Sequence, residues 1–185
     1  MDPKVQLFGW LMLAPFLVFV VFAFRTFMVP ARAAAGPGLM LGAASMFSGI
    51  TLAAWEGRHG AYQPALWAIG AVIAISAIVL YEYSRRTVTG RGFYSVMSGA
   101  VPGTVCSVGP YRYIRHPVYT SYILAFLALL VAFPGMPTAL AFVANIAFYI
   151  YAASHEERSI VHSEIGQAYA SYRQGTGMFF PRVGR

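Results

Sequence analysis

Long apolar runs alternate with polar segments along this 185-residue chain. Five runs contain no Asp, Glu, Lys or Arg, and they cover residues 7–24, 39–55, 65–81, 119–133 and 137–153. A membrane-spanning helix needs about 20 mostly apolar residues, with a range of roughly 17–25. The first three runs reach this length once their flanking residues are counted. The pattern therefore predicts an all-α integral membrane protein with about five transmembrane helices.

The last two runs lie close together and predict a helical hairpin over residues 117–153. The fourth run is short, but Pro117 suits the first turn of a helix and can start it before the run itself begins. The sequence Pro-Gly-Met-Pro at residues 134–137 supplies a tight turn between the two helices.

Two polar segments flank the predicted hairpin. Residues 82–117 are rich in Gly, Ser and Thr and show no clear helical period. Loops of this length are uncommon in compact proteins and usually carry a function. Residues 154–185 predict an amphipathic helix, ended by Gly175 and Gly177. One face of that helix holds Glu157, Val161, Ile165, Ala168, Tyr169 and Tyr172. Without an internal repeat, residues 1–185 are expected to form one membrane domain, with three spans in residues 1–81.

Composition and charge agree with a membrane protein. Hydrophobic residues make up 58% of the chain and charged residues only 10%, against roughly 25% charged in soluble domains. With the N-terminus outside, eleven arginines lie on the inner side, and only Lys4 and Arg58 lie outside. This bias predicts a cytoplasmic C-terminus in an inner (plasma) membrane. The net charge of +7 suits anionic membrane lipids, and we expect no nucleic-acid partner.

Two features near the N-terminus and in the loop bear on processing and redox state. The small residues at 31–36 resemble a signal-peptide cleavage site, but the apolar run before them has 18 residues and exceeds the usual length of roughly 7–15. We therefore expect the first span to be retained.

The sole cysteine, Cys106, excludes an internal disulfide.

Glu157 is unusual because helical spacing places it on the same face as Val161 and Ile165. A carboxylate on an apolar face is costly unless something pairs with it. Ser154 and Glu157 match a capping box, which requires a helix to start at Ser154. If the fifth span instead continues through Ser154, the carboxylate is free to hold a cationic ligand. Spacing alone leaves both interpretations open.

His116 precedes Pro117 at a predicted helix start, where a lone histidine is usually a cap or an interfacial residue. Its neighbours suggest more, because arginines for anions and tyrosines for stacking gather around it. These are Arg112, Arg115, Tyr111, Tyr113, Tyr119 and Tyr122. Tyrosines alone would indicate an aromatic belt; together with the arginines they predict a polar pocket. No residues show a zinc-binding spacing, and we expect no metal.

These motifs resemble a known family. "GPYRYIRHPVY" at residues 109–119, then an apolar hairpin, "EER" and "IGQAYASY", and a closing "FFPR" resemble the isoprenylcysteine carboxyl methyltransferase and phospholipid methyltransferase superfamily over residues 101–182. The resemblance implies S-adenosylmethionine bound at the cytoplasmic side of the hairpin, with residues 82–117 as the cofactor loop. It implies cofactor contacts from Gly103, Thr104, Val105, Cys106, Tyr111, His116, Pro117, Tyr119 and Glu157.

The residue chemistry agrees with that implication. Glu157 can hold the ammonium group of this zwitterionic sulfonium, and aromatic faces attract its cations. A lipophilic or lipid acceptor can enter between the helices from the bilayer, with Arg115 and Glu156 expected to orient it. We therefore predict methyl transfer to oxygen or sulfur of an isoprenylcysteine-like or other small hydrophobic substrate, with phospholipid amine N-methylation as the alternative.

One departure bears on the acceptor. Family members that methylate a prenylated cysteine carry an arginine just before the paired glutamates, and this chain has Ala152 and Ala153 there. Arg158 or Arg173 could substitute for it.

Two other classes of protein compete with an enzyme. A transporter predicts ionisable groups inside the spans, which these runs lack. A non-catalytic subunit could pack through the small residues of the second run, Gly38, Gly42, Ser45 and Gly49.

Overall fold

The computed structural model describes residues 3–26, 37–59, 61, 63–89 and 103–182, with side chains of 22–26 and 37–39 left out of the description. Most residues in these ranges are helical, and no β-strand occurs among them. The elements are α1 (Pro3–Met12), α2 (Ala14–Thr26), α3 (Pro37–His59), α4 (Pro64–Val88), the short 3-10 helix η2 (Gly109–Arg112), α5 (Pro117–Ala132), α6 (Met136–Val161) and α7 (Gly166–Gly175). The candidate cleavage site at 31–36 and much of the predicted loop, 90–102, lie outside the described residues.

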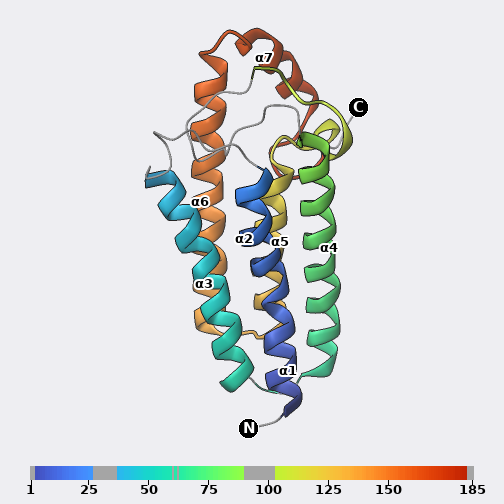
Figure 1. Cartoon of the computed structure of the whole chain (residues 1–185), viewed down its shortest axis with the longest axis vertical. Coiled ribbons are helices and arrows are strands. Elements are labelled where there is room, and N and C mark those ends of the chain that lie inside the picture. The colour runs from blue at the N-terminus through green and yellow to red at the C-terminus, as the bar shows by residue number, and fades with distance from the viewer. Residues whose placement is uncertain (1–2, 27–36, 60, 62, 90–102, 183–185) are drawn as a thin grey trace.

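The long helices run up and down along one axis (Figure 1). Three described segments are long and apolar enough to cross a membrane, namely Pro3–Val21, Pro64–Val88 and Met136–Val161. The helix α5 is apolar but shorter. The protein is therefore an all-helical integral membrane protein, while the number of spans remains a prediction.

The first apolar run forms two helices rather than the single helix expected from its length. The break falls at Leu13, whose N–H bonds to the Trp10 carbonyl at 3.1 Å, a shorter-range bond than in an α-helix. Pro15 follows directly, in the first turn of α2. Proline has no N–H to continue the hydrogen-bond ladder, and its ring clashes with the preceding turn, so a helix breaks there.

Close packing holds the N-terminal helices together. Lipid tails are as apolar as the helix surfaces, so the hydrophobic effect contributes little to helix association within a membrane. Gly9 on α1 crosses Gly57 on α3 so closely that a Cβ at position 9 would lie 2.1 Å from the Gly57 Cα. The side chains of Phe16, Phe19 and Tyr149 are fully buried in the largest core cluster. Tight contact between small residues and buried rings thus supplies the dispersion energy of the bundle.

A buried polar contact joins α3 to α6 within the apolar region. The Ser45 hydroxyl donates to the Asn145 side-chain oxygen and lies 2.8 Å from the Tyr149 hydroxyl. The Asn145 amide in turn donates to the Ala141 carbonyl at 2.8 Å. In lipid, polar side chains need such partners, and bonds of this kind contribute roughly 0.6–2 kcal/mol. This contact accounts for Ser45 and Asn145 without invoking transport.

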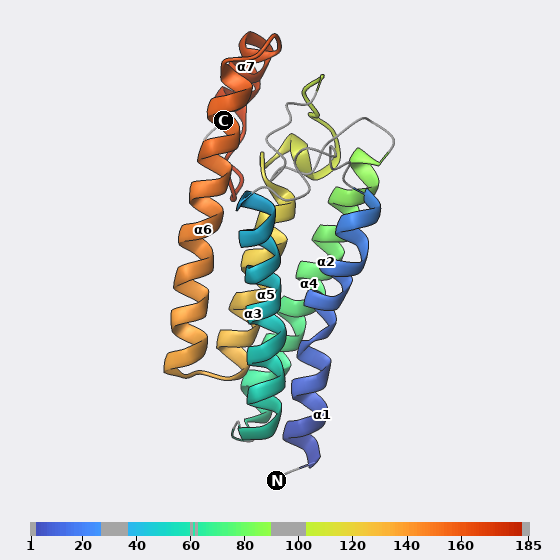
Figure 2. The same cartoon turned by 60° about the vertical axis from the view of Figure 1, so that its left-hand side comes forward.

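The hairpin forms as predicted, with α5 starting at Pro117 and α6 at Met136, on either side of a short turn (Figure 2). The helix α6 runs eight residues past the predicted end at 153. The helix α4 likewise continues past its apolar run to Val88, into the predicted loop. Glu82 pairs with Arg85 and Arg86 at 2.6 Å, one turn later on α4, and such pairs support a helix beyond its apolar part.

The tail differs from the single amphipathic helix that the sequence predicts. The first part belongs to α6, the chain turns at residues 162–165, and α7 begins at Gly166. A Cβ at position 166 would lie 2.2 Å from the Val161 carbonyl oxygen, so the turn needs glycine there. The turn folds α7 back over the end of the bundle that also carries η2 (Figure 1). We call this end the polar end.

Candidate functional site

Two segments far apart in sequence pair through their backbones at the polar end. Ile114 and Gly177 form a parallel bridge. The N–H groups of Arg115 and His116 donate to the carbonyls of Gly177 and Met178, at 2.8 and 3.1 Å. The Gly177 N–H donates to the Tyr113 carbonyl at 3.2 Å. The segment before α5 is therefore fastened to the segment after α7.

Side chains reinforce this pairing on both sides. The Tyr172 hydroxyl on α7 donates to the Tyr111 carbonyl in η2 at 2.6 Å. The Thr120 hydroxyl on α5 donates to the Phe179 carbonyl at 3.2 Å. Burial raises the pKa of Tyr172, which lies above its ordinary value, so its phenol stays neutral and keeps its proton for this bond.

Gly177 is the residue that allows the two segments to approach. A Cβ at this position would lie 1.7 Å from the Phe180 carbonyl oxygen, well inside van der Waals contact. Because backbone rather than a flexible side chain is in the way, any larger residue must displace the segment after α7. The sequence suggested Gly177 only as a helix end, and nothing in its spacing indicated a close backbone approach.

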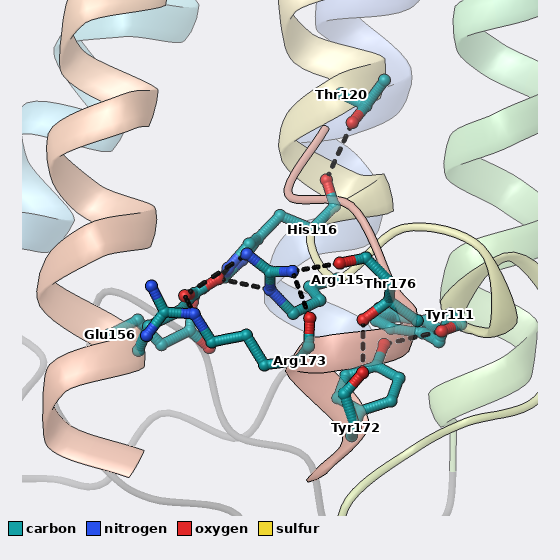
Figure 3. A network of polar contacts seen from close by, with 9 residues as sticks. Tyr111, Arg115, His116, Thr120, Glu156, Tyr172, Arg173 and Thr176 are labelled. Atoms are coloured by element: carbon teal, nitrogen blue, oxygen red, sulfur yellow. Dashed lines mark hydrogen bonds and ion pairs between the residues drawn. The ribbon is translucent and has the colours of Figure 1, made fainter. Parts of the chain in front are cut away.

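Glu157 lies at the centre of a cluster of ionised side chains. Its partners Arg115, His116 and Arg173 are labelled in Figure 3. Its side chain is 3% exposed, and Arg115 Nε donates to Oε1 at 2.7 Å. His116 Nε2 lies 3.1 Å from the same oxygen, and Arg173 Nε lies 3.3 Å from Oε2. The structure thus brings together residues from the α5 start, α6 and α7 around one buried carboxylate.

The capping-box interpretation of Glu157 is wrong. The helix α6 passes through Ser154 without a break, and Glu157 lies in its penultimate turn. Its carboxylate therefore does not cap a helix start but meets cations from elsewhere in the fold. The side chain of His116 makes no cap bond either, although the residue occupies the N-cap position of α5.

Arg115 uses most of its donors on protein atoms. Besides its bonds to Glu157, Nη1 donates to the Thr176 carbonyl and lies 3.4 Å from the Arg173 carbonyl. The side chain is only 8% exposed. A planar guanidinium held from both sides fixes the position of the carboxylate it bonds. This geometry suits Arg115 to positioning Glu157 rather than to direct contact with an acceptor.

His116 carries a positive charge at neutral pH. Burial alone would lower its pKa, but contacts with the negatively charged carboxylates of Glu156 and Glu157 outweigh burial and raise the pKa from 6.5 to about 9. Nδ1 lies 3.4 Å from Glu156 Oε2, and Nε2 faces Glu157. The imidazolium therefore bridges the two adjacent glutamates.

Two buried polar atoms next to this cluster have no hydrogen-bond partner among the described residues. They are the Tyr119 hydroxyl and Glu156 Oε2, although the latter keeps its ionic contact with His116. The rings of Tyr119 and His116 stack with centroids 5.5 Å apart and an angle of 7° between them. Buried polar atoms in native structures are usually satisfied, so these two atoms are available to a water molecule or to a ligand.

The remaining residues of the predicted cofactor set range from fully buried to exposed. Cys106 and Tyr111 are buried together against Val88 of α4. Val105 is half-buried, while Gly103 and Thr104 are exposed, and no atom lies within 4 Å of a Cβ built on Gly103. Pro117 is fully buried in the first turn of α5. The structure thus buries Cys106, Tyr111 and Pro117 and leaves the first two members of the set at the surface.

Several residues that complete the site were missed as site residues by sequence reasoning. Thr176 and Gly177 contribute backbone carbonyls, and Tyr172 contributes the bond to η2. Hydrogen bonds made by backbone atoms do not depend on the side chain, so the residue type does not indicate them. The only available signal was the cluster of tyrosine and glycine around the end of the tail helix.

Comparison with known proteins now identifies the family. The family model described as Phospholipid methyltransferase matches residues 61–163, more than half of the chain. The chain belongs to the phospholipid methyltransferase family. It is therefore a member of the integral-membrane methyltransferases that its motifs resemble. No individual curated protein matches the chain.

The phospholipid methyltransferase match covers α4, η2, α5 and α6 but ends before α7 begins at Gly166. His116, Glu156 and Glu157 fall inside it. Arg173, Thr176 and Gly177 fall outside it, although they touch the same cluster. The matched part of the chain thus carries the glutamates, and the segment beyond it completes their surroundings.

Proposed function

We propose that this protein transfers a methyl group from S-adenosylmethionine to a lipophilic acceptor at the polar end of the bundle. The observation that carries the proposal is the meeting of His116 with Glu156 and Glu157 in a buried cluster, inside a chain of a methyltransferase family. A water-soluble donor and an oily acceptor must meet at the membrane surface, and this cluster lies at the ends of apolar helices.

The residues at the cluster suit a zwitterionic sulfonium. Tyr111 and Tyr119 offer aromatic faces for a cation, and the unmatched Tyr119 hydroxyl and Glu156 Oε2 offer acceptors for a cofactor ammonium. When bound, S-adenosylmethionine supplies an electrophilic methyl group on sulfur. Glu156 is better placed than Glu157 to bond it, because Glu157 already faces Arg115, His116 and Arg173.

Glu157 and Arg115 act as positioning residues in this proposal. Glu157 holds His116, and His116 stacks on Tyr119, so the carboxylate sets the orientation of an aromatic wall. Arg115 ties Glu157 to the segment after α7 through the Thr176 carbonyl. Correct alignment of donor and acceptor can supply on the order of 7–11 kcal/mol of the barrier reduction. A rigid cluster is what such alignment requires.

The identity of the acceptor is a separate matter. Ala153 is fully buried in the largest core cluster, so no cation stands where carboxylate-methylating relatives carry an arginine. This favours an acceptor other than a prenylcysteine carboxylate. An oxygen or sulfur nucleophile on a small hydrophobic molecule fits, and so does the amine of a phospholipid, which the family description favours. In this proposal, the polar end of the bundle lies on the cytoplasmic side, because most of the arginines are expected on that side.

Cofactor binding and methyl transfer test the proposal separately. Purified protein in detergent should bind S-adenosylmethionine, or its demethylated product, at about micromolar concentration in calorimetry. Radiolabelled cofactor should then label a lipid-extractable product from fractionated membrane lipids or hydrophobic thiols. Binding without transfer to any fraction would favour an unrecognised acceptor. Absence of both binding and transfer would contradict the proposal and support a non-catalytic subunit.

A further inference from the structure

A cavity of about 250 Å³ lies between the last turns of α6 and the segment that runs through α7 to Met178. Besides Glu157, its lining consists of Ser154, Arg158, Val161, His162, Arg173 and Met178. A second hollow, which shares Val161 and Arg173, continues it towards Gln174 and Arg182. We call this pair of cavities the α6–α7 groove.

The groove carries excess positive charge. Arg158 and Arg173 line the first cavity, and Arg182 lines the second. The one carboxylate in the lining, Glu157, is already bonded by Arg115 and His116 on its other side. Among the described residues, Arg158 has no carboxylate within ion-pair distance, and the Arg173 side chain is 54% exposed. The groove therefore attracts an anion, and two guanidinium groups suit a phosphate in particular.

The groove also lies within reach of the lipid headgroup layer. The outer face of α6 carries exposed apolar side chains as far as Tyr151, including Val143 and Ile150. Arg158 follows Tyr151 by seven residues, about 10 Å along the helix at 1.5 Å per residue. The headgroup layer on each side of the hydrocarbon core is roughly 5–8 Å thick. With Tyr151 at the edge of the hydrocarbon core, the Arg158 backbone therefore lies at or just beyond the outer edge of this layer, and its long side chain can reach back to a lipid phosphate.

The groove is mixed in polarity, as a lipid headgroup and upper acyl chain require. Val161 and Met178 form apolar parts of the lining beside the cations. Phe180, which is 75% exposed, follows within two residues of Met178. Purely solvated arginines would not need apolar neighbours of this kind, whereas an amphiphile uses both.

We propose that the α6–α7 groove binds the phosphate of a membrane lipid through Arg158 and Arg173. Arg173 also lies 3.3 Å from Glu157, so a lipid held here has its headgroup beside the cluster of Glu157 and His116. The bound lipid is then the methyl acceptor or presents it. That last step rests on the proposed function, whereas binding of the lipid phosphate does not.

The test measures lipid binding to the full chain in an uncharged maltoside detergent. Three probes are titrated by calorimetry: dihexanoyl phosphatidylglycerol, dihexanoylglycerol without phosphate, and inorganic phosphate. The phospholipid should bind at least about tenfold more tightly than either other probe, since dihexanoylglycerol lacks the charge-assisted hydrogen bonds and inorganic phosphate lacks the apolar contacts. Arg158→Gln and Arg173→Gln should each weaken phospholipid binding about tenfold. Arg158 is exposed on the helix surface, so its replacement leaves folding intact.

Arg86→Gln is the matched control, because it removes the same charge from an exposed position on α4 outside the groove. It should change phospholipid binding less than about twofold, a change within 0.5 kcal/mol for an uninvolved surface residue. If Arg86→Gln weakened phospholipid binding as much as the groove variants do, the effect would come from the net charge of the protein alone, and the proposal would be overturned. Equal binding of dihexanoylglycerol would show an apolar groove only, and equal binding of inorganic phosphate would show a free-anion site; either result contradicts a lipid-phosphate site.

Cofactor binding separates this proposal from the proposed function. Arg158→Gln should bind S-adenosylmethionine as the wild type does, because among the described residues the Arg158 side chain makes no hydrogen bond or ion pair with the cluster around Glu157. In a transfer assay, the variant should raise the KM for a phospholipid acceptor and leave kcat nearly unchanged. Normal lipid binding with neither cofactor binding nor methyl transfer would leave the groove assignment standing and contradict the enzymatic proposal alone.

Discussion

Arg115 Nε donates to Glu157 Oε1 at 2.7 Å, although 42 residues separate the two in sequence. Both side chains are almost fully buried, and a membrane hairpin lies between them in the chain. A buried charge pair costs desolvation and contributes little net stability by itself. Its effect here is to fix where α6 lies relative to the start of α5, and hence where Glu156 and His116 meet.

Replacing Glu157 by glutamine should destabilise the protein strongly. Glutamine removes the negative charge that Arg115 and His116 face, and leaves two buried cations without their partner. Breaking a buried pair in this way costs roughly 3–5 kcal/mol. Thermal unfolding in detergent should show a clear fall in Tm for Glu157→Gln. Glu164→Gln, at an exposed position in the turn before α7, should leave Tm nearly unchanged; similar curves for the two variants would contradict the role assigned to Glu157.

Stability should decrease as pH rises through the pKa of His116. Its pKa is raised from 6.5 to about 9 in the folded protein, so the folded state binds the proton more tightly than the unfolded state. The resulting stabilisation is fully present below about pH 6.5 and is lost as pH rises towards and past 9. Tm measured from pH 6 to 10 should therefore fall for the wild type. His116→Gln should show a flatter profile over this window, and an unchanged profile would refute the linkage.

Gly177→Ala should disrupt the site while leaving the membrane helices folded. The added Cβ would lie 1.7 Å from the Phe180 carbonyl, so the segment after α7 must move and lose its bonds to Tyr113 and Arg115. S-adenosylmethionine affinity should fall about tenfold or more, with helical circular dichroism unchanged. Gly135→Ala is the control, since a Cβ there meets its nearest atom at an ordinary 3.7 Å. Equal cofactor affinity in both variants would argue against a role for the backbone pairing.

The helical membrane fold could be predicted because it depends on properties that are local in sequence. Uncharged apolar runs must become helices in lipid, where every backbone group needs an internal partner. The turn at residues 134–137 and the start at Pro117 follow from proline and glycine preferences in the same way. The family membership was predictable because the motif around His116 and the paired glutamates occur in a specific order.

The arrangement of the site was less predictable because it depends on contacts between distant segments. Spacing alone could not decide whether Glu157 capped a helix, since the outcome depends on whether α6 continues through Ser154. The break at residues 162–165 arises from a close backbone approach at Gly166, in a segment whose periodicity indicates one helix. The cation partners of Glu157 likewise come from two distant segments, the start of α5 and α7, and only the folded backbone reveals which ones.

The pairing of Ile114 with Gly177 has a consequence for biosynthesis. Every described apolar helix has been made once translation reaches Val161, at the end of α6. The backbone partner of the segment before α5 comes later, at residues 177–178. Insertion into the bilayer can therefore precede assembly of the cluster around Glu157. In a nascent chain, the charged residues of the cluster cannot take up their final positions until these later residues emerge from the ribosome.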